Sequence, residues 1–470
     1  MCLDLYVIRD PNCIGYCCQK PENLLQKISI AAEAGFDFIE VWHKDIIEFK
    51  NKFGLSPFIE KIKELNIKVA SLKVLNNWFI GDDSLALVDL AKDINAEILV
   101  VKLVPDEYFK SPIDLDHCIK RYNKLLSISN EKNIKPAIEF MALAKYMNKI
   151  DDVYKILDFS QGENKCLVLD TWHLWRNDDE QFTNFIKTIN NLNIDWAGIV
   201  HFTDAAKNIH RTQQKDGDRR MPTQGCLNLS KFSDVINNMG FSGYYSLNVY
   251  DKNLWNYDNL QTAVSGKYYM LETIFSNKIL ADSNLWSNNQ QTRCDALWAK
   301  NYKTHLDPRI KKTIRDQILI QKLESYLKDK YVLDFKCGFS PLAELVSEGF
   351  DASNECISYL KRKYPNKKWH NKSDQEFSNN FFNKIDVLLH IGLGDSNTEE
   401  DSHMLIRKNC KPELVIIECA ADENKQINES KIGNRTRWEN LKKGLKIIEE
   451  FDYETDMADR KYRKLIVAKL

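Results

Sequence analysis

The chain has 470 residues, roughly three times the length of a typical domain, which predicts two domains. Its 66 Lys and Arg residues nearly balance 67 Asp and Glu residues, and the net charge of -1 provides no overall positive field for a nucleic acid backbone. The N-terminus lacks the pattern of a signal peptide and no run of about 18 apolar residues occurs, so we expect a cytoplasmic protein without a membrane span.

The first 275 or so residues alternate short apolar runs with amphipathic stretches. The runs cover residues 3–8, 36–42, 67–74, 96–103, 134–140, 165–172, 195–202 and 243–249. Helical patterns such as residues 24–35 and 57–66 lie between them. Strands that are apolar on both faces and alternate with helices indicate a parallel sheet covered by helices. Eight such units predict a (β/α)8 barrel over residues 1–276, with an open doubly wound sheet as the alternative.

A polar stretch follows the predicted barrel. Residues 277–306 are rich in Asn, Gln and Ser, which predicts a linker. A second series of apolar runs then occupies residues 331–335, 350–353, 385–392, 412–420 and 464–470, with a helix-like pattern over 341–349. We therefore predict a smaller Rossmann-like α/β domain over residues 307–470, with a short edge strand at its end.

Polar residues at the ends of four consecutive strands predict a metal site. In such barrels the chemistry lies at the carboxyl ends of the strands, where the βα loops converge. Strands five to eight end in Glu139, Asp170, His201 and Asn248. Any one of these side chains alone would be explained by a helix cap or a loop hydrogen bond. Two carboxylates, an imidazole and an amide together suit Mn2+, Mg2+, Co2+ or Zn2+.

The stretches AAEAGFDFIEVW, LVLDTWHLWR, VHFTDA and RRMPTQG resemble the xylose-isomerase-like sugar isomerase and epimerase barrels. The resemblance covers roughly residues 1–275. It implies that Glu139, Asp170 and His201 bind a divalent metal, and that His173 and Arg220 contact substrate oxygens. It also implies a second glutamate on the last strand.

The chain departs from that pattern at Asn248, which stands in place of the usual glutamate. An amide oxygen can bind a metal but brings no charge and takes up no proton, so metal affinity should fall and a two-base epimerisation loses one base. An aldose–ketose isomerisation or a dehydration beside a ketone stays open, as does a barrel that only binds a polyol. Asp251 is the alternative source of a carboxylate. Our hypothesis is that Glu139 or a neighbouring carboxylate removes a proton while His173 and Arg220 orient the substrate.

The run YVLDFKCGFSPLAELVSEGFDAS has the order of a strand, a tight turn, a helix and a strand ending in acid, which is how Rossmann-like sheets hold a nucleoside. It resembles the first motifs of class I S-adenosylmethionine-dependent methyltransferases. The matching positions are Asp334, Cys337, Gly338 and Asp351. The resemblance implies S-adenosylmethionine at Asp334, Gly338 and Asp351. Lys336 and Ser340 stand where that family usually has glycine. The alternative to a cofactor-binding turn is an ordinary turn in a structural domain.

The leading interpretation is a bifunctional small-molecule enzyme. It joins a metal-dependent isomerase, epimerase or dehydratase, acting on a sugar or polyhydroxy ketone, to a methyltransferase-like domain. We expect a small-molecule substrate and neither a nucleic acid nor a membrane partner. A homo-oligomer stays open as an alternative to a monomer. The alternative is a non-catalytic sugar-binding or regulatory protein, favoured by Asn248 and Lys336. A nuclease of the same barrel class would need further metal ligands and a basic face, against which the net charge argues.

Overall fold

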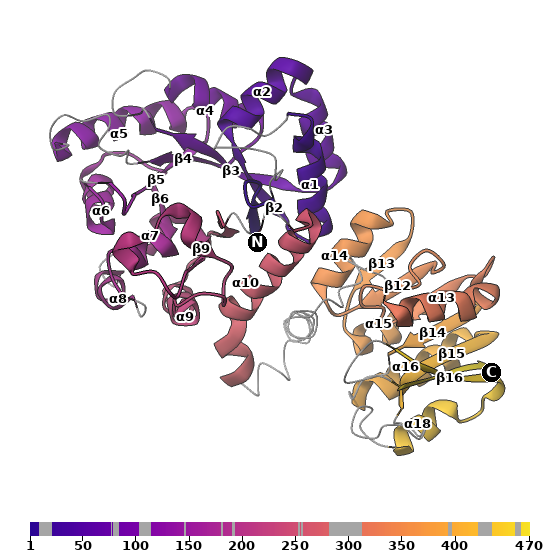
Figure 1. The fold of residues 1–470 in the computed structure, drawn as a ribbon. Helices are drawn as coiled ribbons and strands as arrows, with labels where there is room; N and C mark the ends of the chain where they lie inside the picture. Colours follow the sequence, from indigo (N-terminus) through magenta and orange to yellow (C-terminus); the bar gives the residue numbers. More distant parts are fainter. Residues whose placement is uncertain are drawn as a thin grey trace. The chain divides into compact units, whose positions relative to one another are not determined.

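The computed structural model describes two compact units, Met1–Leu280 and Ala281–Leu470, coloured indigo to magenta and orange to yellow in Figure 1. The described residues are 1–8, 21–76, 78, 84–102, 114–144, 147–179, 182–189, 193–251, 254, 257–281, 313–392, 397–421, 435–455 and 462–470. Helix α10 (Asn259–Ala281) continues through the first residues of the stretch predicted as a linker from residue 277. The rest of that stretch, 282–306, lies outside the described residues.

The first unit is a closed barrel of eight parallel strands, in the order β1-β10-β7-β6-β5-β4-β3-β2. This confirms the predicted (β/α)8 barrel and excludes the open sheet. Its strands are β1 (Cys2–Asp4), β2 (Phe38–Trp42), β3 (Lys68–Leu75), β4 (Ile98–Lys102), β5 (Lys135–Glu139), β6 (Cys166–Asp170), β7 (Ala197–Phe202) and β10 (Tyr244–Leu247). A two-stranded ribbon of β8 (Asp204–Ala205) and β9 (Arg219–Arg220) lies between β7 and β10 in the chain.

Helices surround the barrel because each buries one apolar side against the strands. They are α1 (Asn23–Glu33), α2 (His43–Phe53), α3 (Ser56–Glu64), α4 (Ser84–Asp93), α5 (Leu115–Asn130), α6 (Ile150–Phe159), α7 (Thr171–Arg176), α8 (Thr183–Ile189), α9 (Leu229–Asn238) and α10. In α9, for example, Leu229, Phe232 and Ile236 recur at helical spacing and are buried. Asn228 caps this helix by accepting from the Lys231 N–H at 3.1 Å.

The barrel interior is apolar below its carboxyl end. One buried cluster joins Ile98, Val100, Ala137, Cys166, Val168 and Ile199 from four neighbouring strands. Because side chains on a strand alternate between its two faces, the residue two positions further along points the same way. Two residues beyond Ala137, Val168 and Ile199 stand Glu139, Asp170 and His201. The polar layer therefore lies directly on an apolar floor.

The second unit contains a seven-stranded sheet in the order β13-β12-β11-β14-β15-β17-β16. The strands are β11 (Val332–Phe335), β12 (Glu348–Asp351), β13 (Lys368–Asn371), β14 (Val387–Ile391), β15 (Leu414–Ala421), β16 (Lys446–Glu454) and β17 (Tyr462–Lys469). Five strands are parallel, and β17 runs antiparallel between β15 and β16. The last strand is therefore interior, and the predicted edge strand is wrong: β16 takes the edge.

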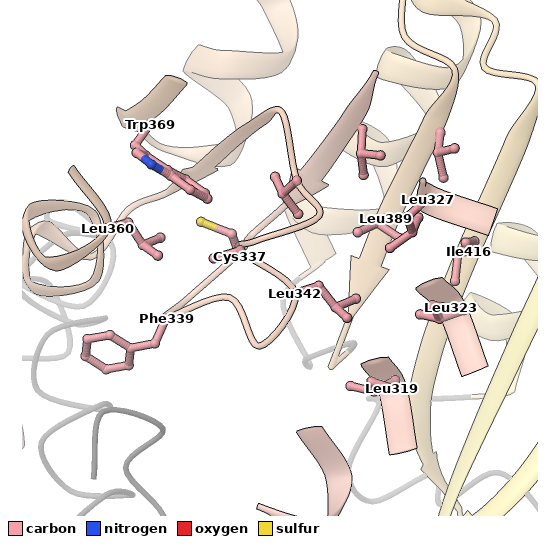
Figure 2. Packing of buried hydrophobic residues seen from close by; sticks show 14 of the residues in the cluster. Leu319, Leu323, Leu327, Cys337, Phe339, Leu342, Leu360, Trp369, Leu389 and Ile416 are labelled. Atoms are coloured by element: carbon pink, nitrogen blue, oxygen red, sulfur yellow. The ribbon is translucent and has the colours of Figure 1, made fainter. Parts of the chain in front are cut away.

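Helices pack on both faces of this sheet. Figure 2 shows one core, where Leu319, Leu323 and Leu327 of α13 (Ile314–Leu327) meet Leu389 and Ile416 of the sheet. The remaining helices are α14 (Asn354–Lys363), α15 (Asp374–Asn380), α16 (Asn397–Cys410) and α18 (Arg435–Lys442). None of the helices in the described part of the chain is both long and apolar enough to cross a membrane.

The connection from β11 to β12 differs from the expectation. A helix was predicted over residues 341–349, but residues 341–345 form turns and β12 begins at Glu348. Leu342 and Val346 pack into the core in this turn conformation (Figure 2 labels Leu342). Leu333, near the start of β11, pairs with Glu348, the first residue of β12. After the turn the chain must therefore run back along β11 within a few residues, which leaves no length for a helix.

Candidate metal centre

Three predicted ligands meet at the carboxyl end of the barrel. Ligand atoms of Glu139, Asp170 and His201 all lie within 4.8 Å of one another, and all three side chains are buried. The His201 Nδ1 atom is 2.8 Å from Glu139 Oε1 and 3.7 Å from Asp170 Oδ2. This arrangement follows from the strand register, because Asp170 on β6 pairs directly with His201 on β7.

The other ring nitrogen of His201 faces a third carboxylate. His201 Nε2 lies 3.2 Å from Glu40 Oε1 on β2. Ser71 donates to Glu40 at 2.6 Å, and Ser246 also donates to it. A carboxylate that accepts the Nε2–H leaves the Nδ1 lone pair directed at Glu139 and Asp170, which is the orientation that metal-binding histidines require.

Buried charges shift the pKa values of the centre. Burial alone disfavours the imidazolium of His201, as does Lys73, but Glu40 and Glu139 more than offset both, and the pKa of His201 rises to about 10. Burial opposes ionisation of Glu139, yet Lys102 and His201 lower its pKa. Asp170 behaves likewise, with Arg219 as the main lowering group. Metal uptake would therefore have to displace a proton from His201.

Asn248 directly follows β10, and its N–H donates to the Phe202 carbonyl of β7 at 3.4 Å. Two residues before and after it, Ser246 donates to Glu40, and the Tyr250 hydroxyl lies 3.4 Å from Asp4 Oδ2. Asn248 is 1% exposed, and its Oδ1 accepts no hydrogen bond from the described residues. An acceptor oxygen with no donor is what a bound cation would satisfy, so this donor set fits a divalent metal.

Two further charged residues occupy the barrel interior. Lys73 on β3 places Nζ 3.0 Å from Asp4 Oδ2 and 3.7 Å from Glu40 Oε1, with no exposed side-chain surface. Sequence reasoning missed Asp4 and Lys73. Each is a charged residue flanked by apolar residues of its strand, and that pattern was the available signal.

The arginine at the centre is Arg219, where Arg220 had been expected. Arg219 Nη1 donates to both Asp170 oxygens at 3.1 and 2.9 Å, and Nη2 lies 3.4 Å from His173 Nε2. Arg220 lies 3.2 Å from Asp251 Oδ2 and is partly exposed. Neighbouring residues on β9 point to opposite faces, so only one of the two arginines can reach Asp170. Asp251, the proposed substitute carboxylate, is thus paired with Arg220.

A family model described as xylose isomerase-like TIM barrel matches residues 28–267. The chain belongs to this family. The inosose isomerase of Halalkalibacterium halodurans is 24% identical over 241 residues, which cover 48% of this chain and 83% of that protein. The family is one of sugar isomerases and epimerases, as the sequence predicted.

Two solved structures share the fold of this xylose isomerase-like barrel. A zinc-bound IOLI protein has a TM-score of 0.51 and 17% identity, over 58% of this chain and 98% of that one. A fusion of a xylose isomerase-like TIM barrel with a 4-hydroxyphenylpyruvate dioxygenase also has a TM-score of 0.51, with 15% identity, over 61% of this chain and 44% of that one. At these identities the likeness is one of fold.

Asp204 organises the loop that carries Arg219 in the xylose isomerase-like barrel. Its carboxylate accepts from the backbone N–H groups of Ala205, Gly225 and Leu227 at 2.8–2.9 Å. Gly225 is pressed against it: a Cβ there would lie 2.2 Å from both Asp204 Oδ1 and the Ala205 carbonyl oxygen. Asp204, which ends the motif His201-Phe-Thr-Asp204, is therefore a loop-shaping residue.

Gly225→Ala is expected to destabilise the barrel by about 1–3 kcal/mol, because the added methyl forces the loop apart. Denaturant unfolding of the purified protein measures this change. Gly217→Ala, in the connection between β8 and β9, is the matched control, since a Cβ there meets nothing within 4 Å. Equal stability of the two variants would contradict the close approach at Gly225.

The predicted cofactor residues of the second unit lie around the turn after β11. Asp351 accepts from the Gly338 N–H at 3.1 Å and from the Ser353 N–H at 2.7 Å. Lys336 and Ser340 have φ values of 57° and 41°, in the left-handed region that glycine favours. The turn therefore keeps a glycine-like backbone at these two positions, on either side of Gly338. Lys336 Nζ also lies 3.3 Å from Asp374 Oδ2.

Asp334 should make the second unit less stable as the pH rises. Burial raises its pKa to about 7, although Ser340 donates to it at 2.6 Å. A carboxyl group whose pKa is higher in the folded state contributes fully below its unfolded pKa near 4, and this stability is lost as the pH rises through 7. Asp334→Asn is expected to match the wild type near pH 4 and to exceed its stability by up to about 4 kcal/mol at pH 8. Urea unfolding at both pH values tests this, and a pH-independent difference would contradict it.

Proposed function

We propose that the barrel is a divalent-metal-dependent isomerase of a sugar or another polyhydroxy ketone or aldehyde, working with one carboxylate base. The observation that carries the proposal is the buried set of Glu139, Asp170 and His201. The buried Asn248 oxygen, which accepts no hydrogen bond from the described residues, is the proposed fourth ligand. A zinc-bound protein of the same fold and a related inosose isomerase support it. The neutral Asn248 favours isomerisation or dehydration over two-base epimerisation.

In this proposal four residues bind the metal and one of them, Glu139, is also the base. Glu139, Asp170, His201 and Asn248 would hold the metal, which when bound polarises a carbonyl and acidifies the neighbouring C–H. Glu139 accepts that proton through Oε2, the oxygen that does not face His201. We assign the base role to Glu139 because it is the carboxylate of the set that no arginine holds.

His173 and Arg219 orient the substrate in this proposal. The Ala142 N–H donates to His173 Nδ1 at 3.3 Å, and burial lowers the pKa of the ring, so a neutral His173 carries its proton on Nε2. That N–H can donate to a substrate hydroxyl that displaces Arg219 Nη2, which lies 3.4 Å from Nε2. Arg219, rather than Arg220, is the arginine that we propose for contact with the substrate, because it lies at the centre and donates to both Asp170 oxygens.

The test combines metal analysis with proton exchange. Purified protein should contain about one divalent ion per chain, and a panel of inosose, ketoses and aldoses in D2O should show deuterium uptake beside the carbonyl by NMR. A chain that keeps no metal and exchanges no proton in any of these compounds would favour the non-catalytic, polyol-binding alternative.

For the second unit we propose binding of S-adenosylmethionine at the carboxyl ends of β11 and β12. The strand order reverses between β11 and β14, and ligands of open α/β sheets bind in the crevice at such a point. The glycine-like backbone at Lys336 and Ser340 and the acid Asp351 support it. The helix-free connection to β12 removes the helix N-terminus that such a site normally offers. Titration calorimetry decides: no heat at millimolar cofactor would reject this half.

A further inference from the structure

Lys102 differs from the other charged groups of the centre in its access to solvent. It is the last residue of β4 and pairs in register with Glu139 on β5. Its Nζ lies 3.1 Å from Glu139 Oε2, and its side chain is 13% exposed, against 1% for Glu139 and 0% for His201.

The two interior lysines are in different situations. The charge of Lys73 is held by Asp4 and Glu40, and no part of its side chain is exposed. Within the described part of the chain, the ammonium of Lys102 has one close partner, Glu139 Oε2. An ammonium carries three N–H donors, so Lys102 has donors left for a ligand. Glu139 Oε2 in turn is buried and makes no hydrogen bond of good geometry with described residues.

Lys102 Nζ and Glu139 Oε2 therefore form a close pair, 3.1 Å apart, at the partly exposed side of the centre. We propose that Lys102 is a catalytic residue that donates a hydrogen bond to the substrate oxygen that gains negative charge when Glu139 removes the neighbouring proton. The inference rests on the proposed isomerase function. It names the kind of group the substrate must present: a carbonyl group whose neighbouring carbon carries an acidic C–H, with that C–H within reach of Glu139 Oε2 and the carbonyl oxygen within reach of Lys102 Nζ.

The step balances without any further reactant. The C–H bond breaks and its proton moves to Glu139, the bonding pair forms a C=C bond, and the carbonyl pair moves onto oxygen, where the Lys102 N–H stabilises it. Return of the proton from Glu139 to the adjacent carbon, with transfer of a hydroxyl proton between the two oxygens, gives the isomer. Asn248 supports this role, because a glutamate there would add negative charge to a centre that must accommodate an oxyanion.

The experiment compares an anionic mimic of that intermediate with a neutral polyol. Metal-loaded full-length wild type, Lys102→Gln and Lys102→Arg are titrated with glycolohydroxamate and with myo-inositol by calorimetry. Lys102→Gln is expected to weaken hydroxamate binding about 10- to 100-fold, the range of a charge-assisted hydrogen bond, and to change myo-inositol binding less than about 2-fold. Lys102→Arg should recover part of the loss. Lys135→Gln, which removes the same charge at the first and exposed residue of β5, is the matched control.

Two further measurements, metal content and deuterium exchange, distinguish the role of Lys102 from the proposed function itself. Metal content should be unchanged in Lys102→Gln, and deuterium exchange into inosose should slow about 100-fold, in kcat more than in KM. Unchanged hydroxamate binding, or an equal loss for hydroxamate and myo-inositol, overturns the role of Lys102 and leaves the isomerase standing if the wild type still exchanges. Absence of metal and of exchange in the wild type rejects the proposed function, and the role of Lys102 with it.

Discussion

Glu139→Gln is expected to reduce proton exchange into an active ketose or inosose by about 1,000-fold or more, since the variant loses the base. Glutamine preserves the shape of the side chain but removes the charge that pairs with Lys102 at 3.1 Å and with His201 at 2.8 Å. Metal content should fall as well, because one of two anionic ligands is gone. Exchange followed by NMR and metal analysis by mass spectrometry give the two measurements.

The control for this variant should remove a carboxylate outside the centre and leave the fold unchanged. Glu163→Gln removes an exposed carboxylate from the loop before β6 and should leave metal content and exchange unchanged. His201→Ala should lose metal as Glu139→Gln does. If neither variant lost metal or changed turnover of a substrate that the wild type converts, the assignment of this centre would be wrong.

Asn248→Glu is expected to increase divalent metal affinity about 10- to 100-fold, because it adds a charged ligand to the set. In the metal-free protein the same change should lower the melting temperature, since a further carboxylate is buried without a metal ion to compensate its charge. Added metal should reverse that loss. The signature is thus a gap between metal-free and metal-loaded melting temperatures that is wider in the variant than in the wild type.

Asn248→Gln is the matched variant, because it lengthens the side chain without adding charge. It should widen the gap little or reduce affinity through crowding. Equal metal affinities of the Glu and Gln variants would show that charge at this position does not reach the metal, and would place residue 248 outside the ligand set.

Strand ends were the part of the site that the sequence could locate. Glu139, Asp170 and His201 each terminate an apolar run, and parallel strands closed into a barrel bring such ends together. The position of Arg219 could not be predicted in the same way. It depends on which of two adjacent arginines faces inward, and a two-residue strand has no hydrophobic alternation from which to tell.

Other differences have the same origin in tertiary contacts. The apolar spacing of Leu342, Ala343 and Val346 fits a helix, but the pairing of β11 with β12 fixes a short return, and the same side chains are buried in turns instead. Strand β16 was not predicted, because its residues hardly alternate between buried and exposed: Lys446 to Glu450 are all exposed. Burial of Lys73 with Asp4 depends on strands that are 69 residues apart in the chain.

The interior position of β17 has a consequence for how the chain is made. The barrel can close once β10 has emerged from the ribosome, because β1 and β7, its neighbours, precede it. The seven-stranded sheet is different, since β17 supplies all the pairing between β15 and β16 and ends at Lys469. During synthesis the first unit can therefore fold while the second still exposes the open edge of β15. Removing the last eight or nine residues should leave a folded barrel attached to an aggregation-prone sheet.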